Sequence, residues 1–182
     1  MGVTARERTG GTFWRWAVVT APLVILIGFT SGRSAPSGSD NPWYVALAKP
    51  ALNPPDWMFP IAWGLIYVCM GLALATVLDA RGASRRWPAV GLFALLMALL
   101  FAWQPLFFGA RAITAATWLI GGIVAVGIAT TVLFGRIRRS AAWLMLPLLV
   151  WSGFAGVLSW RIDRLNPGAE AVAPEPAGSQ MA

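Results

Sequence analysis

The chain has 182 residues, of which 58% are hydrophobic and only 12% are charged, and its formal net charge is +7. A soluble domain of this size cannot hide so much apolar surface, so the composition indicates an integral membrane protein. The positive charge fits arginines that lie beside membrane spans and meet anionic lipid, and no basic stretch is long or soluble enough to predict nucleic-acid binding.

Five apolar segments are long enough, or nearly so, to cross a membrane as helices. The segments between them are rich in Pro, Ser, Gly, Asn or Arg, which is typical of loops. A β-barrel is disfavoured because its strands would be shorter and would alternate polar with apolar residues. We therefore predict an all-α bundle in one domain, 13–165, between a basic N-terminal segment, 1–12, and a disordered C-terminal tail, 166–182. The expected spans are 13–30, 59–78, 88–108, 113–134 and 141–160.

The first span also has features of a cleaved signal peptide, because Arg6 and Arg8 precede it and small residues follow it. Its apolar run is longer than the usual core of such a peptide, about 7 to 15 residues. Trp14 and Trp16 at its start suit a membrane-interface anchor, so we expect a retained helix. Three further tryptophans near span ends are expected to be interface anchors as well: Trp87, Trp143 and Trp160.

The distribution of Lys and Arg predicts an orientation. The side that holds the N-terminus collects nine of these residues and the other side five, which places the N-terminus in the cytoplasm by the positive-inside rule. The loop 31–58 and the C-terminus would then face outward. Thirteen Arg to one Lys, with abundant Ala and Gly, suggest a GC-rich genome and hence a bacterial cell membrane.

Several kinds of chemistry are excluded by missing residue types. Cys69 is the only cysteine and there is no histidine, which excludes an intrachain disulfide, haem ligation by His and the common zinc sites. None of the seven acidic residues falls in the middle of a span, so a carboxylate metal site or proton pathway within the bundle is not expected. No nucleotide-binding loop or serine-nucleophile elbow occurs. We expect no cofactor.

The segment 42–70 is the most informative part of the chain, because a Trp- and Pro-rich loop runs directly into the second span. This combination favours an ordered loop that closes over a cavity. Pro54 and Pro55 would fix the loop and allow a helix to begin after them, with Trp57 in its first turn.

Aromatic residues of three spans are expected to meet in that cavity. Trp63 and Tyr67 are four residues apart and therefore lie on one helix face. Trp103 in the third span and Trp151 in the fifth would approach from other helices. Flat aromatic ligands stack well on such walls.

Three blocks of residues resemble the tryptophan-rich sensory protein and translocator protein family, also called peripheral-type benzodiazepine receptors. The resemblance covers about 42–166 and is carried by Trp, Pro and Phe at fixed spacing. The blocks are Pro42-Trp43-Tyr44, Leu47, Lys49-Pro50, Pro54-Pro55, Trp57, Phe59, Trp63, Tyr67 and Met70-Gly71; Trp103 and Pro105-Leu106-Phe107-Phe108-Gly109; and Pro147, Trp151, Phe154-Ala155, Leu158 and Leu165-Asn166.

The resemblance implies a five-helix bundle whose cavity, capped by the first loop, binds porphyrins, sterols and synthetic aromatic ligands. Lys49, or an Arg of a loop, would pair with porphyrin propionates at a wet loop. The expected ligand-binding residues are Trp43, Tyr44, Lys49, Pro54, Trp57, Trp63, Tyr67, Trp103, Phe107, Trp151 and Phe154.

The chain departs from the family pattern at several positions. Polar residues usual on the third helix are replaced by Leu96 and Leu100, so that wall of the pocket should be less polar. Aromatic residues often found after the Lys-Pro are replaced by Ala51 and Leu52. On the fifth helix, Leu148 and Ser159 stand at positions where the family usually has Tyr and Asn, and the sterol-recognition pattern carries Trp160 in place of Tyr.

Four functions remain open at this stage. The first is a receptor or regulator that binds tetrapyrroles, and the second is a light- and oxygen-dependent porphyrin-degrading enzyme in which Trp63 and Trp151 react. The third is a tetrapyrrole or lipid transporter, which the lack of an inverted repeat and of intramembrane charge disfavours. The fourth is a membrane scaffold. A small-residue face with Gly121, Gly122 and Gly127 suits close helix packing, compatible with a homodimer.

Overall fold

The computed structural model describes residues 6–171, which contain helices and no strands. Five helices are long and apolar enough to cross a membrane, which confirms the predicted all-α fold. The long helices are α1 (Arg6–Gly32), α3 (Met58–Asp79), α4 (Arg86–Gln104), α5 (Ile113–Ile137) and α6 (Arg139–Leu165). The short elements are η1 (Gly38–Asp40), α2 (Pro42–Ala46), η2 (Pro105–Gly109) and η3 (Ala169–Ala171).

Several helices extend beyond the expected spans. α1 begins at Arg6 and α6 continues to Leu165, whereas the apolar pattern predicted 13–30 and 141–160. Hydropathy marks the part of a helix that lies in hydrocarbon, and a helix continues past that part with polar residues because its backbone bonds do not depend on side-chain polarity.

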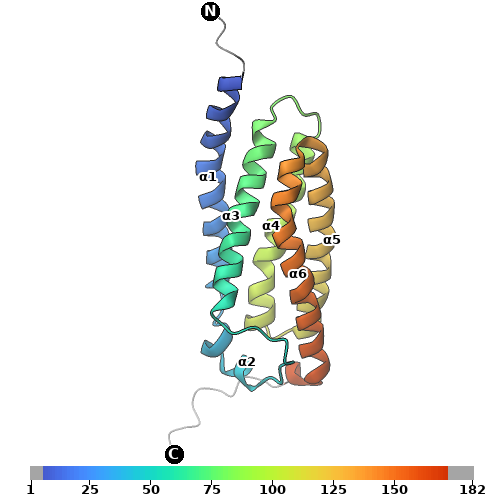
Figure 1. The fold of residues 1–182 in the computed structure, drawn as a ribbon. Coiled ribbons are helices and arrows are strands. Elements are labelled where there is room, and N and C mark those ends of the chain that lie inside the picture. The colour runs from blue at the N-terminus through green and yellow to red at the C-terminus, as the bar shows by residue number, and fades with distance from the viewer. Residues whose placement is uncertain (1–5, 172–182) are drawn as a thin grey trace, which may run out of the picture.

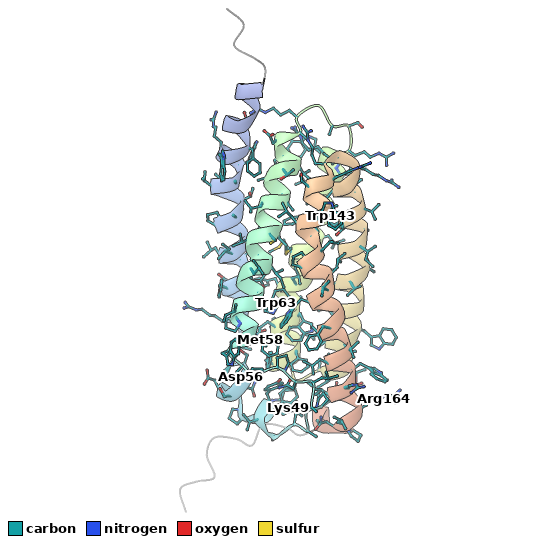
Figure 2. All side chains as sticks on the ribbon, in the orientation of Figure 1. Lys49, Asp56, Met58, Trp63, Trp143 and Arg164 are labelled. Atoms are coloured by element: carbon teal, nitrogen blue, oxygen red, sulfur yellow. The ribbon has the colours of Figure 1, made fainter. Side chains whose placement is uncertain are left out.

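The contacts between the long helices form a closed ring. α1 packs on α3, α3 on α6, α6 on α5, α5 on α4, and α4 returns to α1. The N-terminal end of α1, the α3–α4 loop and the α5–α6 turn share one end of the bundle. The other end, here called the loop end, carries α2, the α4–α5 turn and the end of α6 (Figure 1). Figure 2 shows Trp143 toward the end opposite the loop end, and its side chain is exposed there.

A small-residue contact joins α1 to α3. A Cβ atom at Gly71 would collide with the backbone of Ala21, so only glycine allows the two helices to lie this close. The hydroxyl of Thr20 donates to the carbonyl oxygen of Gly71 at 2.7 Å and shares the same proton with that of Trp16 at 3.0 Å. Close packing and a polar bond within the apolar layer therefore fix α1 against α3.

The end of α4 is reshaped by Pro105. Proline has no N–H, so the carbonyl of Phe101 cannot accept the usual helical bond from residue 105. That carbonyl accepts a hydrogen bond from the hydroxyl of Ser31 on α1 at 2.9 Å. The chain continues as the π-helical turn η2, in which the N–H of Ala110 donates to the carbonyl of Pro105 at 2.8 Å. This turn directs the aromatic side chains of 107–108 toward the loop end.

Candidate functional site: an aromatic cavity beneath the first loop

A cavity of about 390 Å³ opens at the loop end of the bundle. Its volume lies within the range of roughly 300–1,000 Å³ that small-molecule sites occupy. The walls come from all five long helices, from η2 and from residues 37–40, 44 and 56 of the first loop (33–57). The aromatic residues of its lining are Phe29, Tyr44, Phe59, Trp63, Tyr67, Trp103, Phe107, Phe108 and Trp151.

One wall is a stacked aromatic pair on α3. The rings of Trp63 and Tyr67 lie 5.3 Å apart between centroids, with 26° between their planes. Gly28 of α1 lies directly against the Tyr67 ring and leaves no space for a Cβ atom. The absent side chain at Gly28 is therefore what allows Tyr67 to stack on Trp63.

A second stacked pair comes from α4 and η2. Trp103 and Phe107 have ring centroids 5.1 Å apart and planes 19° apart. From α6, Trp151 makes a T-shaped contact with Phe59, with ring centroids 5.8 Å apart and 80° between their planes. Rings from separate helices thus form a broad aromatic lining suited to a flat ligand.

Two buried polar atoms of lining residues have no hydrogen-bond partner among the described residues: the indole Nε1 of Trp103 and the hydroxyl Oγ of Ser152. Leaving a buried donor or acceptor unpaired costs about 1–3 kcal/mol. A ligand with a suitably placed polar atom would offset that cost.

The first loop is held by side-chain hydrogen bonds to the backbone. Asn41 caps α2, because its side chain accepts a bond from the N–H of Tyr44 at 3.2 Å, and Pro42 occupies the first turn. This short helix presents Trp43 and Tyr44 to the bundle, where both are buried. Trp43 contacts Phe107 with ring centroids 5.8 Å apart.

Asn166, just after α6, ties the loop to the bundle. Its side chain accepts a bond from the N–H of Ala48 at 2.8 Å and donates to the carbonyl oxygens of Ala48 at 2.8 Å and Ile162 at 2.7 Å. Part of the segment predicted as a disordered tail is therefore placed against the bundle, and Glu170 accepts a bond from the N–H of Thr114 at 2.7 Å. The rest of that tail, 172–182, lies outside the described residues.

The hydroxyl of Tyr44 stays protonated at the cavity. It donates to the side-chain oxygen of Asn53 at 3.1 Å. Burial raises the pKa of Tyr44, and the charge of Asp56 raises it further. Tyr44 therefore contributes a neutral polar group.

The sequence model of the TspO/MBR family matches residues 18–165. The chain belongs to the TspO/MBR family. It is 35% identical to the tryptophan-rich protein TspO of Chlorobaculum tepidum over 147 residues, which cover 80% of this chain and 92% of that protein. It is 36% identical to the translocator protein of Sus scrofa over 160 residues, which cover 85% of this chain and 92% of that protein.

Six residues predicted for ligand binding in this TspO/MBR family member line the cavity. They come from α2, α3, α4, η2 and α6: Tyr44, Trp63, Tyr67, Trp103, Phe107 and Trp151. These include Trp63 and Trp151, the two residues expected to react if the protein is an enzyme.

The other five predicted residues lie outside the lining. Trp43 packs behind Phe107, and Phe154 packs beside Trp151 with ring centroids 5.7 Å apart. Pro54 is buried within the first loop. Trp57 precedes the first turn of α3 as its N-cap and is 63% exposed.

Lys49 also lies outside the lining, and its ammonium group is already engaged. Nζ donates to the carbonyl oxygens of Val45 and Leu47, each at 3.2 Å, and lies 4.6 Å from the centroid of the Tyr44 ring. Figure 2 shows Lys49 at the loop end and Trp63 farther along the bundle.

Of the residues that depart from the usual TspO/MBR pattern, some line the cavity and others do not. Leu100 lines it, whereas Leu96 is fully buried in the core and does not. Ala51 and Leu52 are exposed on the loop and do not line it either. Among residues 6–171, no group of three His, Cys, Asp or Glu side chains is placed to hold a metal ion.

Ser152 and Asp56 were not predicted as site residues, although both line the cavity. A hydroxyl beside Trp151 in an apolar span is a signal that would have identified Ser152. Nothing in the sequence would have identified Asp56, because acidic residues are common in polar loops and most of them have no role in a site.

Proposed function

We propose that the protein is a membrane receptor or regulator that binds tetrapyrroles, such as protoporphyrin IX and haem precursors, and similar flat hydrophobic ligands. The observation that carries the proposal is the aromatic cavity under the first loop, lined by Trp63, Tyr67, Trp103 and Trp151. A planar macrocycle buries a large apolar area against such rings, and stacked pairs contribute about 0.5–1.5 kcal/mol beyond that burial.

The polar features of the cavity support the same proposal. The unpaired indole N–H of Trp103 would donate to an acceptor of the ligand, and the hydroxyl of Ser152 would donate or accept. The relative from Cereibacter sphaeroides, 33% identical over 124 residues, is named tryptophan-rich sensory protein, a name that fits a receptor.

The test is a titration with protoporphyrin IX in the dark, followed by the porphyrin absorbance. The double variant Trp63→Phe/Trp151→Phe keeps aromatic rings but loses area and indole character, so we expect about tenfold weaker binding. The matched control is Trp118→Phe/Trp143→Phe, since both of these residues are highly exposed and outside the lining. Equal affinity for the two double variants would contradict the proposal.

A second candidate function is light- and oxygen-dependent degradation of porphyrin. It is favoured by the position of Trp63 and Trp151, which both line the cavity and would lie beside a bound porphyrin, where the light-driven reaction would consume dioxygen as its oxidant. Illumination of the bound sample tests it. A discrete product formed by the wild type and not by Trp63→Phe/Trp151→Phe would support the enzyme, and bleaching as in protein-free detergent would contradict it.

We also propose a bacterial cell membrane with the N-terminus in the cytoplasm. The Arg-rich α3–α4 loop and α5–α6 turn lie at the same end of the bundle as the start of α1 (Figure 1). The count of nine cationic residues on one side against five on the other grouped these same segments together. The cavity would then open toward the outer side. The test is a reporter that is active only in the cytoplasm, fused after residue 171. Activity of this fusion would contradict the proposed orientation.

A further inference from the structure

The charge of the cavity lining has one sign. Asp40 and Asp56 line the cavity, and no Lys or Arg is among its lining residues. Both carboxylates lie at the loop end, where a ligand would enter, and both are exposed enough to be partly screened by water.

Asp56 is held in place by the loop. Its carboxylate Oδ2 accepts a hydrogen bond from the backbone N–H of Ser39 at 2.8 Å. Gly38, in the same turn, has a φ of 60°, which glycine adopts without strain. The charge of Asp56 raises the pKa of the Tyr44 hydroxyl, so the negative charge of Asp56 acts on a residue that lines the cavity.

Five cations lie at the same end: Lys49, Arg111 and Arg164 are turned to other partners, and Arg33 and Arg161 are exposed to solvent. Lys49 is bound to backbone carbonyls over the Tyr44 ring, the Arg111 guanidinium lies 6.0 Å from the centroid of the Trp43 ring, and that of Arg164 lies 5.8 Å from the Trp160 ring. None of these five side chains lines the cavity to neutralise a ligand carboxylate.

The unpaired polar atoms of the lining are neutral. Ser152 is only 4% exposed, and its hydroxyl and the Trp103 indole N–H have no partner among the described residues. Such groups suit uncharged acceptors like esters, ketones or amides, whereas a buried carboxylate needs a cation or several donors.

We propose that the cavity selects uncharged or cationic flat ligands over anionic ones, so that among tetrapyrroles it prefers those whose carboxyl groups are esterified. This inference rests on the proposed tetrapyrrole-binding function. Asp40 and Asp56 repel free propionates at the mouth, and Trp103 and Ser152 accept a neutral polar group inside.

The test compares protoporphyrin IX, which has two free carboxyl groups, with its dimethyl ester. Both are titrated in the dark into the wild type and into Asp40→Asn/Asp56→Asn. Two exposed carboxylates shift affinity modestly, so we expect the wild type to bind the ester about fivefold more tightly than the acid. The variant should reduce this ratio by strengthening acid binding, and salt near 1 M should reduce it in the wild type by shortening the Debye length to about 3 Å.

The control variant is Asp79→Asn/Asp163→Asn, which removes two charges outside the lining and should keep the wild-type ratio. Comparing ratios between proteins cancels any difference in how the two porphyrins partition into detergent. Acid binding as tight as ester binding, or an unchanged ratio in Asp40→Asn/Asp56→Asn, would overturn the charge selection and leave the proposed function standing. Absence of saturable binding for both porphyrins would overturn both.

Discussion

Gly28 on α1 determines where the ring of Tyr67 lies, because the ring occupies the space that a Cβ atom at residue 28 would need. Alanine there would gain about 1 kcal/mol of helix propensity but meet a steric cost of about 1–3 kcal/mol. The ring can move into the cavity, so we expect Gly28→Ala to change the melting temperature little and to weaken porphyrin binding about tenfold.

The control for this prediction is Gly91→Ala on α4, where an added Cβ atom meets open space. Dark titration and thermal unfolding of both variants separate an effect on the site from an effect on the fold. Porphyrin affinity that is equal in the two variants would contradict the role of Gly28.

At this scale the sequence predicted aromatic positions better than polar ones. The four-residue spacing of Trp63 and Tyr67 is enough to place both on one helix face, and they stack in the structure. The position of Lys49 could not be predicted, because it depends on carbonyl groups that only the folded loop brings within reach.

The contact between α1 and α3 depends on Gly71. The atoms that a Cβ atom at residue 71 would meet belong to the backbone of Ala21, and they cannot move without separating the helices. We expect Gly71→Ala to lower the free energy of unfolding by about 1–3 kcal/mol, measured by SDS titration. Gly64→Ala on the same helix has open space and should unfold like the wild type. Equal stability of the two variants would show that this close approach is not needed.

The join between α1 and α4 depends on Ser31. Its hydroxyl donates a hydrogen bond to the carbonyl oxygen of Phe101. That carbonyl lacks its usual helical donor because Pro105 has no N–H. Ser31→Ala should cost about 1 kcal/mol of unfolding free energy, because a partly buried carbonyl loses its donor. Thr30→Ala removes an exposed hydroxyl that bonds only to its own helix, at Leu26, and should cost less. The reverse order of costs would contradict this account.

The elements could be predicted from apolar length, but their ends and irregular turns could not. Pro105 in an apolar run indicates a kink or a helix end equally well. The π-helical turn that follows depends on the fit of α4 against α5, which arises only when the helices pack.

At the scale of the whole molecule, Asn166 holds the first loop against the bundle. Its side chain bonds to Ala48 in that loop and to Ile162 near the end of α6. Asn166→Ala should speed porphyrin release and hydrogen exchange at the Ala48 amide by about tenfold, because the loop loses its bonds to the bundle. Asn166→Asp keeps the acceptor for the Ala48 N–H and loses the donor, so its effect should be intermediate. Unchanged release rates in Asn166→Ala would contradict the role of Asn166.

The ring order of the helices and the closure of the loop are properties of the whole chain that the spans alone did not predict. Five spans are compatible with many arrangements, and contacts between distant residues such as Ala48 and Asn166 decide among them. The homodimer stays a prediction; Gly121 and Ala125 are exposed on α5, where Gly121 meets open space.

The most direct test of a ligand-binding cavity is the stoichiometry of protoporphyrin IX binding to the wild type in the dark, measured at two detergent concentrations. The account predicts saturation at one porphyrin per chain, with the same endpoint at both concentrations, because the cavity has room for a limited ligand volume. Binding that fails to saturate and grows with the amount of detergent would mean that the porphyrin enters the micelle, and it would contradict the account.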